Sequence, residues 1–182
     1  MPGRAISTVA EINQVDHAVY EAIARSPTPS LDRELATLSR IADHSKLWLA
    51  CAGLMAWRGG PPGRRAAVRG LTAIAVASGG VNLGVKLLSR RGRPDRAGAA
   101  VPEARHVRMP ISSSFPSGHA ASAFAFATAA GHANLAFDVP LRVLATLVAY
   151  SRIHTGVHYP GDVLVGALIG GVAGNAVAAI RR

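Results

Sequence analysis

The sequence contains one cysteine, Cys51, among 182 residues. A single thiol excludes an intramolecular disulfide and any metal cage built from several cysteines. Because Cys51 lies in an apolar run, we interpret it as a small packing residue. The spacings of histidines and carboxylates that are typical of zinc or magnesium sites are also missing. We therefore expect no metal and no other cofactor.

Aromatic residues are scarce, at 5% of the chain. Acidic residues are also few: the chain has 10 aspartates and glutamates but 20 lysines and arginines. In a soluble protein the resulting net charge of +10 would favour nucleic acid as a partner. Here the basic residues are not interleaved with aromatics as nucleic-acid binding would require, and they mostly flank apolar runs. We therefore expect no nucleic-acid partner and assign the charge to bound anions, lipid headgroups among them.

The first 25 residues lack the continuous apolar core of a cleavable signal peptide. Farther along, runs of alanine, valine and leucine with 19 glycines favour close-packed membrane helices. A soluble alanine-rich bundle is the alternative. The length suits one domain, and we expect an all-α protein whose membrane insertion depends on internal helices.

Residues 5–24 show helical amphipathic periodicity, which predicts a helix on the membrane surface rather than across it. The two prolines within residues 26–30 end this helix, and Ser30 is the expected N-cap of the next one. We divide the chain into an N-terminal interfacial helix and turn, 1–30, and a membrane-embedded domain, 31–182.

The membrane-embedded domain is predicted to be an integral membrane bundle of about five transmembrane helices. Its first helix is expected to run unbroken over 31–58, although the fully apolar part, 47–57, is short against the roughly 20 residues of a span. A turn follows at 59–65. Further spans are predicted at 66–89, 118–137, 141–153 and 161–180, with a long and hence functional loop at 90–117.

Three short motifs lie at the ends of these spans. They read K-x6-R-P from Lys86 to Pro94, P-S-G-H from Pro116 to His119, and S-R-x5-H-x3-D from Ser151 to Asp162. Because successive spans alternate in direction, all three motifs are predicted to lie at the same face of the membrane.

In this order and spacing the motifs resemble those of the type 2 phosphatidic acid phosphatase (PAP2) family, whose members dephosphorylate lipid and polyprenyl phosphates. The family shares its site with vanadium haloperoxidases. The resemblance covers 86–162 with the flanking apolar segments and says little about 1–45. It implies a PAP2/haloperoxidase-like helical core. Bacterial members commonly have six spans, and we expect the N-terminal amphipathic helix to replace the missing one.

The resemblance also implies a role for each motif residue in a metal-independent phosphatase. His158 is the expected nucleophile, which forms a phosphohistidine, Asp162 orients it, and His119 protonates the leaving oxygen. The expected phosphate-binding residues are Lys86, Arg93, Ser117, Gly118 and Arg152. The residue types suit this chemistry, because arginine forks and helix-start amides bind phosphate oxygens.

Other polar residues receive simpler interpretations. Arg90, Arg91 and Arg96 are expected to contact lipid headgroups. His154 lies outside the motifs, and His132 is expected to pack or to bond between helices. The polar cluster Asp43, His44 and Lys46 is a possible lining of the substrate entrance.

The expected substrate is a lipid phosphate, in contact with membrane lipids. A polyprenyl phosphate, a polyprenyl diphosphate or a polyprenylphosphoryl-sugar phosphate of cell-wall synthesis comes first, since the alanine, glycine and arginine content resembles small bacterial members from GC-rich genomes. Phosphatidic acid or phosphatidylglycerol phosphate comes next, and a non-catalytic lipid-binding membrane protein is the alternative of another class. The resemblance implies a multi-pass cell-membrane protein with an extracytoplasmic site; the oligomeric state stays open.

Overall fold

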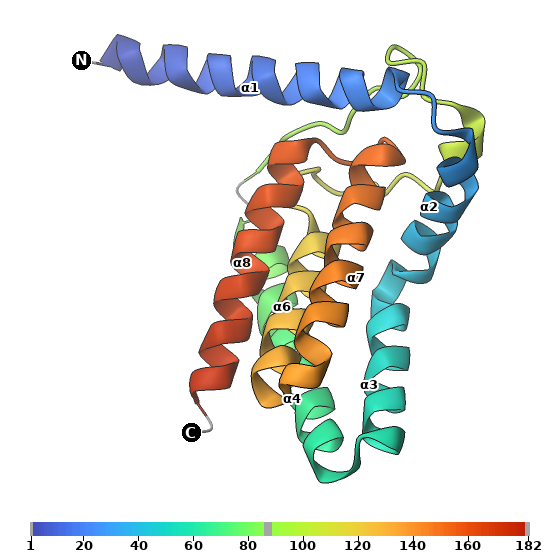
Figure 1. Cartoon of the computed structure of the whole chain (residues 1–182). Coiled ribbons are helices and arrows are strands. Elements are labelled where there is room, and N and C mark those ends of the chain that lie inside the picture. The colour runs from blue at the N-terminus through green and yellow to red at the C-terminus, as the bar shows by residue number, and fades with distance from the viewer. Residues whose placement is uncertain (1, 86–88, 181–182) are drawn as a thin grey trace.

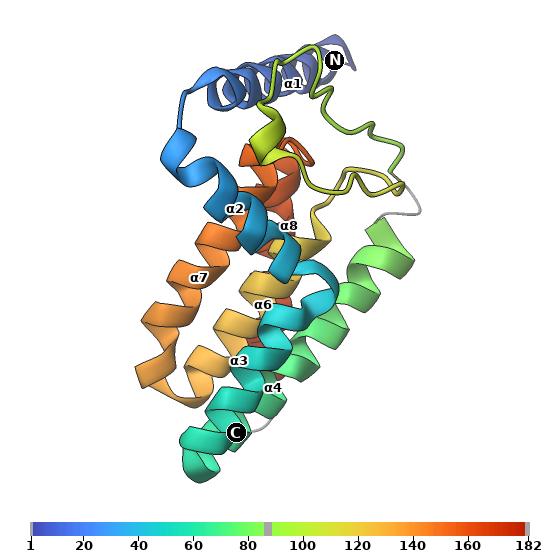
Figure 2. The same cartoon turned by 90° about the vertical axis from the view of Figure 1, so that its right-hand side faces the viewer.

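The computed structural model describes residues 2–85 and 89–180 (Figure 1). Every regular element in this part of the chain is helical, which confirms the all-α prediction. The helices are α1 (Pro2–Arg25), α2 (Pro29–Ile41), α3 (Lys46–Arg58), α4 (Gly60–Gly79), α6 (Gly118–Ala133), α7 (Leu135–His154) and α8 (Pro160–Ala179). A π-helical segment, Gly80–Val85, extends α4, and short 3-10 helices occur at Asp43–Ser45 and Glu103–Arg105. Helix α1 lies across one end of the bundle (Figures 1 and 2).

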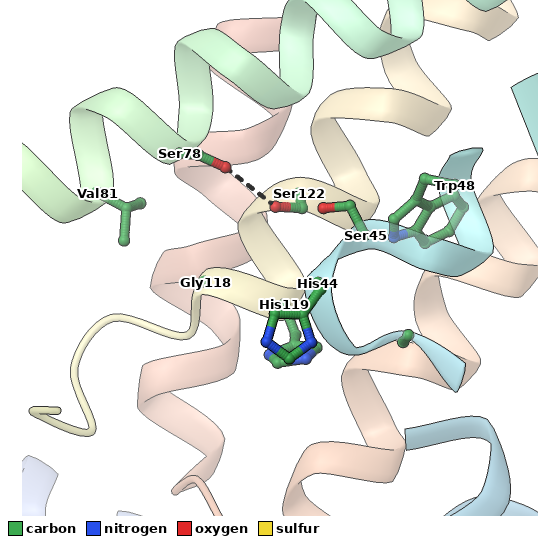
Figure 3. A pocket seen from close by; sticks show the side chains of 9 residues that line it. His44, Ser45, Trp48, Ser78, Val81, Gly118, His119 and Ser122 are labelled. Carbon is green, nitrogen blue, oxygen red and sulfur yellow. Dashed lines mark hydrogen bonds between the residues drawn. The ribbon is translucent and has the colours of Figure 1, made fainter. Parts of the chain in front are cut away.

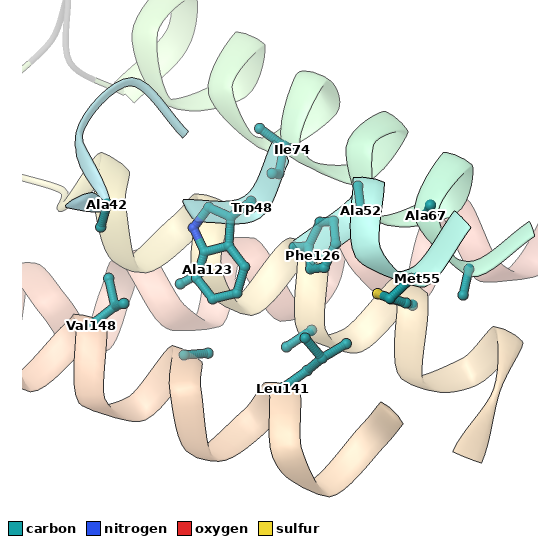
Figure 4. Close-up of a cluster of buried hydrophobic side chains, with 14 residues drawn as sticks. Ala42, Trp48, Ala52, Met55, Ala67, Ile74, Ala123, Phe126, Leu141 and Val148 are labelled. Atoms are coloured by element: carbon teal, nitrogen blue, oxygen red, sulfur yellow. The ribbon is translucent and has the colours of Figure 1, made fainter. Parts of the chain in front are cut away.

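Helix α6 is the centre of the bundle and packs against α4, α7 and α8. Its side chains join an apolar core with α3, α4 and α7 (Figure 4). In this core the rings of Trp48 and Phe126 lie 5.3 Å apart, centroid to centroid. Burial of each large apolar side chain contributes on the order of 1.5–3 kcal/mol, so α6 is held in place from several sides.

Glycines at every fourth position of α8 bring its backbone against α6. A Cβ atom at Gly166 would lie 2.4 Å from the carbonyl oxygen of Ser117, and one at Gly170 would lie 2.2 Å from that of Ala121. Only glycine permits such an approach, and small residues at the interface are also typical of membrane helix pairs. The start of α8 is therefore fixed next to the start of α6.

The prediction of one helix over 31–58 is wrong. Helix α2 ends at Ile41 and α3 begins at Lys46, because His44 and Ser45 take left-handed backbone angles, with φ of 55° and 58°. That conformation costs roughly 1–2 kcal/mol per residue outside glycine, so the break depends on tertiary contacts. The N-cap prediction is also wrong, since Thr28 is the residue before α2 and Pro29 occupies its first turn.

Two predicted turns are shorter in the structure. Only Gly59 separates α3 from α4, and Pro61 and Pro62 fall in the first turn of α4, where a missing N–H costs little. Only Asn134 separates α6 from α7, and Pro140 lies inside α7. The predicted turn at 59–65 is thus mostly helix, and residues 138–140, left between two predicted spans, belong to α7.

Among the described residues one helix, α8, is both long and apolar enough to cross a membrane. The count of five transmembrane helices therefore stays a prediction. Helix α1 confirms the predicted N-terminal helix, and Ile12, Val15 and Val19 are exposed on it. Its place on the membrane surface likewise stays a prediction.

Candidate active site

The described motif residues meet at one end of the bundle, where α6 begins, α7 ends and α8 begins. The loop before α6 crosses this end beneath α1 (Figure 1). The alternating directions of the helices explain why the described motif residues converge at one end of the bundle. Their place at one face of a membrane stays a prediction. Lys86 lies outside the described residues.

His158 and Asp162 form a buried pair between α7 and α8. The side chain of His158 is 3% exposed and that of Asp162 is fully buried, and His158 Nδ1 lies 3.5 Å from Asp162 Oδ2. Burial lowers the pKa of His158 to about 4, against the opposing effect of the Asp162 hydrogen bond. The imidazole is therefore neutral near pH 7, which is the form that presents a nitrogen lone pair.

Asp162 is held by several groups. Its Oδ2 accepts hydrogen bonds from Ser114 Oγ and, at 2.9 Å, from the backbone N–H of Tyr159. Its Oδ1 accepts one from Arg91 Nη1 at 2.9 Å. Because both oxygens are engaged, the carboxylate has one orientation toward His158.

Arg93 lies beside the other ring nitrogen of His158, with 3.4 Å between Nη1 and Nε2. The same guanidinium donates to the carbonyl oxygens of Val157 at 2.8 Å and Ser112 at 3.0 Å. Arg93 therefore connects the long loop before α6 to the segment that carries His158. A phosphoryl group that reached His158 Nε2 would meet this cation.

Arg152 is almost fully buried near the end of α7. It donates to the hydroxyl and carbonyl oxygens of Ser39, and its Nη1 lies 3.6 Å from Asp43 Oδ1. Its Nε finds no acceptor in the described part of the chain. A buried donor without a partner costs about 1–3 kcal/mol, and a phosphoryl oxygen is one acceptor that would satisfy it.

Ser117 and Gly118 form the start of α6, as the motif predicts. Ser117 is the buried N-cap, and its hydroxyl accepts from the backbone N–H of Ala120 at 3.4 Å. Its own N–H donates to the carbonyl oxygen of Asp162 at 2.9 Å, which connects the starts of α6 and α8. The first amides of a helix have no partner within it and attract anions, so this end of α6 suits a phosphoryl oxygen.

His119 pairs with Asp43, with 2.8 Å between Nε2 and Oδ1. This hydrogen bond is the main cause that lowers the pKa of Asp43, against the effect of burial. We predicted Asp43 only as part of an entrance lining. The break between α2 and α3 instead places it on His119. The sequence pattern predicted an unbroken helix here and gave no sign of this pairing.

The interpretation of Arg91 and Arg96 as headgroup contacts is also corrected, because both side chains are bound within the protein. Arg91 joins Asp162 to Asp16 of α1. Arg96 donates to the carbonyl oxygens of Val107 at 2.8 Å and Gly156 at 3.3 Å. The local pattern gave no sign of these roles, which depend on distant partners.

Two cavities adjoin His119 and share it with His44. The smaller, about 190 Å³, lies between α3, α4 and α6, with Val81 on the α4 side and Trp48 on the α3 side (Figure 3). The larger, about 390 Å³, is lined by Asp43 and by 108–111 of the loop. A leaving group protonated by His119 would extend into this space.

The other histidines that the sequence set aside have structural partners. His132 Nε2 lies 2.9 Å from Asn175 Oδ1 of α8, so of the two predicted roles, packing or a bond between helices, the structure shows the bond. His154 is buried, with Nε2 at 2.9 Å from Thr28 Oγ1 and 3.3 Å from Asp32 Oδ1. It therefore belongs to the packing of α2 on α7.

The comparisons with known proteins agree with this geometry. The model of a family described as the PAP2 superfamily matches residues 67–182, most of the chain and all three motifs. The chain belongs to the PAP2 superfamily. The PAP2 match begins within α4, so α1, α2 and α3 lie before it.

Two curated relatives are similar over two thirds or more of their length. The decaprenylphosphoryl-5-phosphoribose phosphatase of Mycobacterium tuberculosis is 39% identical over 141 residues, 77% of this chain and 75% of that protein. The protein of the same name from Mycolicibacterium smegmatis is 35% identical over 132 residues, 71% of this chain and 67% of that protein.

Two solved structures share the PAP2 fold. Aquifex aeolicus LpxE aligns with a TM-score of 0.68 and 27% identity, over 88% of this chain and 92% of that one. The transmembrane PAP2 type phosphatidylglycerolphosphate phosphatase of Bacillus subtilis aligns with a TM-score of 0.71 and 22% identity, over 93% and 86%. Together the comparisons confirm the predicted family, and with it the prediction of a phosphatase.

Proposed function

We propose that this PAP2 phosphatase is a multi-pass cell-membrane enzyme that removes a terminal phosphate from a polyprenyl-linked lipid. A polyprenylphosphoryl-sugar phosphate is the preferred substrate. The observation that carries the proposal is the buried pair of His158 and Asp162, with Arg93 at the second ring nitrogen of His158 and His119 facing the adjoining cavities. The names of the relatives support the lipid class.

The first chemical step uses His158 as the nucleophile. Its Nε2 lone pair forms a bond to phosphorus while the phosphorus–oxygen bond to the lipid part breaks, and His119 gives a proton to the departing oxygen. Asp162 behind Nδ1 stabilises the positive charge that develops on the imidazole. Asp43 Oδ1 lies 2.8 Å from His119 Nε2, and this hydrogen bond orients the ring that transfers the proton.

The second step returns the enzyme to its starting state. Water attacks the phosphohistidine, the nitrogen–phosphorus bond breaks, and His119 takes up the proton that it lost. Arg93, Arg152, Lys86 and the start of α6 at Ser117 and Gly118 bind the phosphoryl oxygens through both steps. A phosphate monoester carries about 1.5–2 negative charges near neutral pH, so such a set of cations and amides is suited to it.

An extracytoplasmic site is part of the proposal. The end of the bundle opposite the site carries the arginines of the α3–α4 connection, the early turns of α4 and the start of α7: Arg58, Arg64, Arg65, Arg69 and Arg142. Positive residues near span ends favour the cytoplasm. The motif end, whose cations serve phosphate, then faces outward.

Phosphate release from a panel of lipid phosphates by the detergent-purified protein tests the function. The panel contains a polyprenylphosphoryl-sugar phosphate, a polyprenyl phosphate, a polyprenyl diphosphate, phosphatidic acid and phosphatidylglycerol phosphate. We expect the highest kcat/KM for the first. A higher kcat/KM for phosphatidic acid or phosphatidylglycerol phosphate would show that the substrate is a glycerolipid instead of a polyprenyl-linked lipid. If no lipid releases phosphate, the non-catalytic lipid-binding protein is the remaining hypothesis.

Activity is expected to persist in excess chelator, because fixed cations supply the charge that a metal would otherwise provide. Vanadate should inhibit competitively, since its five-coordinate form resembles the transition state of phosphoryl transfer. The measurement is phosphate release with EDTA, with added Mg²⁺ or Zn²⁺, and with a vanadate series. Activity that EDTA abolishes and a metal restores would contradict the proposed chemistry.

Arg108→Gln is expected to reduce selectivity for substrates with a second phosphate. Arg108 lines the larger cavity beside His119, where the leaving group would lie. A sugar phosphate linked through a phosphodiester carries a charge there. The KM for it should rise about 10-fold or more, because a hydrogen bond to a charged group is worth about 1.5–3 kcal/mol and 1.4 kcal/mol corresponds to a factor of ten. The KM for phosphatidic acid should hardly change.

Arg90→Gln is the matched control for Arg108→Gln, because Arg90 lines a different cavity with Arg93. It should affect both substrates alike. Equal effects of Arg108→Gln on the two substrates would show a general electrostatic role instead of recognition of a second phosphate.

A further inference from the structure

One acidic residue of α1 extends into the site although it lies far before the PAP2 match. Asp16 is 8% exposed, whereas its neighbours along the chain, Val15 and His17, are exposed. Buried carboxylates require partners, because an unpaired charge is costly away from water. The partners of Asp16 all belong to the region around His158.

Both oxygens of Asp16 are used. Oδ2 accepts from Arg91 Nη2 at 2.5 Å, and Oδ1 accepts from the backbone N–H of Gly161 at 2.7 Å. Gly161 is the second residue of α8, next to Asp162. A Cβ atom at Gly161 would lie 3.0 Å from Asp16 Oδ2, so the carboxylate fills the space at this glycine.

Arg91 links Asp16 to the proposed catalytic pair. Its Nη1 donates to Asp162 Oδ1 at 2.9 Å, while its guanidinium lies 4.5 Å from the centroid of the Tyr159 ring. One guanidinium thus bridges two carboxylates, and the second of them lies behind Nδ1 of His158.

The bridge has a geometric and an electrostatic consequence. Arg91 is 22% exposed and belongs to a loop, so a single contact with Asp162 would leave its long side chain free to turn. With Asp16 as a second partner, Arg91 is held against Asp162 and fixes the rotation of that carboxylate. Asp16 also balances the charge of Arg91, which would otherwise reduce the attraction between Asp162 and the imidazolium form of His158.

Aromatic contacts keep α1 in the position that this role requires. The ring of Tyr159 lies 5.4 Å from that of Tyr20 and 4.4 Å from that of His17, both on α1. Tyr20 is almost fully buried. Helix α1 is therefore packed on the segment that carries His158, rather than attached to the bundle through Asp16 alone.

We propose that Asp16 is a positioning residue for phosphoryl transfer, which acts through Arg91 to orient and charge-balance Asp162 behind the nucleophile. The inference rests on the proposed catalytic pair His158–Asp162. It assigns to the N-terminal helix a part in catalysis that the three motifs do not contain.

The test is Asp16→Asn in the full-length protein, in detergent, with the preferred lipid phosphate. The amide can still accept from Gly161 N–H, but it supplies no charge to Arg91. We expect kcat to fall about 10- to 100-fold, as for other groups that orient a catalytic residue, with KM changed less than about twofold. Asp16→Glu should recover part of the loss. Glu21→Gln is the control, because Glu21 lies on the same helix and pairs with the exposed Arg25.

A double variant separates positioning from a general structural defect. If Asp16 acts through Asp162, Asp16→Asn combined with Asp162→Asn should have the kcat of Asp162→Asn alone, within about twofold, because residues of one network are not additive. Losses that multiply would overturn the inference, and so would a folded Asp16→Asn with the kcat of the wild type.

Two further measurements keep the outcome interpretable. If Asp16→Asn fails to fold, Arg91→Gln tests the same bridge from the loop, with the same expected kcat loss and the same comparison with Asp162→Asn. The wild type and His158→Ala are measured in parallel. An inactive wild type, or an active His158→Ala, overturns the proposed function; an unaffected Asp16 variant beside an active wild type and an inactive His158→Ala overturns this inference alone.

Discussion

His158→Ala is expected to lower kcat by roughly 10³-fold or more while the substrate still binds, because removal of a covalent step affects the transition state far more than the ground state. Arg93 and Arg152 remain to hold the phosphate. The side chain is almost fully buried between α7 and α8, so a thermal unfolding curve must accompany the kinetics. The measurements are steady-state kcat and KM, and binding of a labelled lipid phosphate.

A labelled phosphoenzyme gives a second readout for His158. Wild type quenched in base, where phosphohistidine survives, should retain label, and His158→Ala should retain none. His132→Ala is the matched control, because His132 lies near the other end of α6 and contacts Asn175. A comparable kcat in His158→Ala and wild type would exclude His158 as the nucleophile.

Asp162→Asn is expected to give a folded protein with kcat reduced by roughly 10² to 10⁴ and a nearly unchanged KM; the corresponding change in a serine protease triad costs about 10⁴. The amide oxygen can still accept from the Tyr159 N–H, which preserves the start of α8. It supplies no charge to an imidazolium and can hold the wrong tautomer of His158.

Kinetics and thermal unfolding decide the role of Asp162 together. Asp138→Asn, which removes an exposed ion pair with Arg142 near the start of α7, is the control for loss of a carboxylate. If Asp162→Asn is unfolded while Asp138→Asn is not, or if it keeps full activity, Asp162 is a structural cap of α8 and not part of the catalytic pair.

Local sequence features predicted the elements that depend on near neighbours. The apolar runs predicted α6, α7 and α8, and the two prolines predicted the end of α1. Boundaries were less accurate where a proline lies in an early turn of a helix, as Pro61 does in α4, because such a position disturbs a helix little.

Residues that act through distant partners were missed. Asp43 and His119 are 76 positions apart, and Arg91 is 71 positions from Asp162 and 75 from Asp16. No periodicity or short motif relates such pairs. The charge of each residue was visible in the sequence, but its partner was not. Arg91 was therefore assigned to lipid headgroups and Asp43 to the substrate entrance, and Asp16 was given no role.

The sequence by itself determined the family, the helical class and the placement of the motifs at one end of the bundle, because motif spacing and the alternation of apolar segments are properties of the chain alone. Tertiary structure decided the break at His44 and Ser45, the pairing of Asp43 with His119, and the bridge from Asp16 to Asp162. Each of these depends on the packing of α1, α2 and the long loop over the ends of α6 and α8. Such packing brings these charges together only after the chain has folded. Their burial away from water then strengthens the interactions between them, so that each charge affects the site.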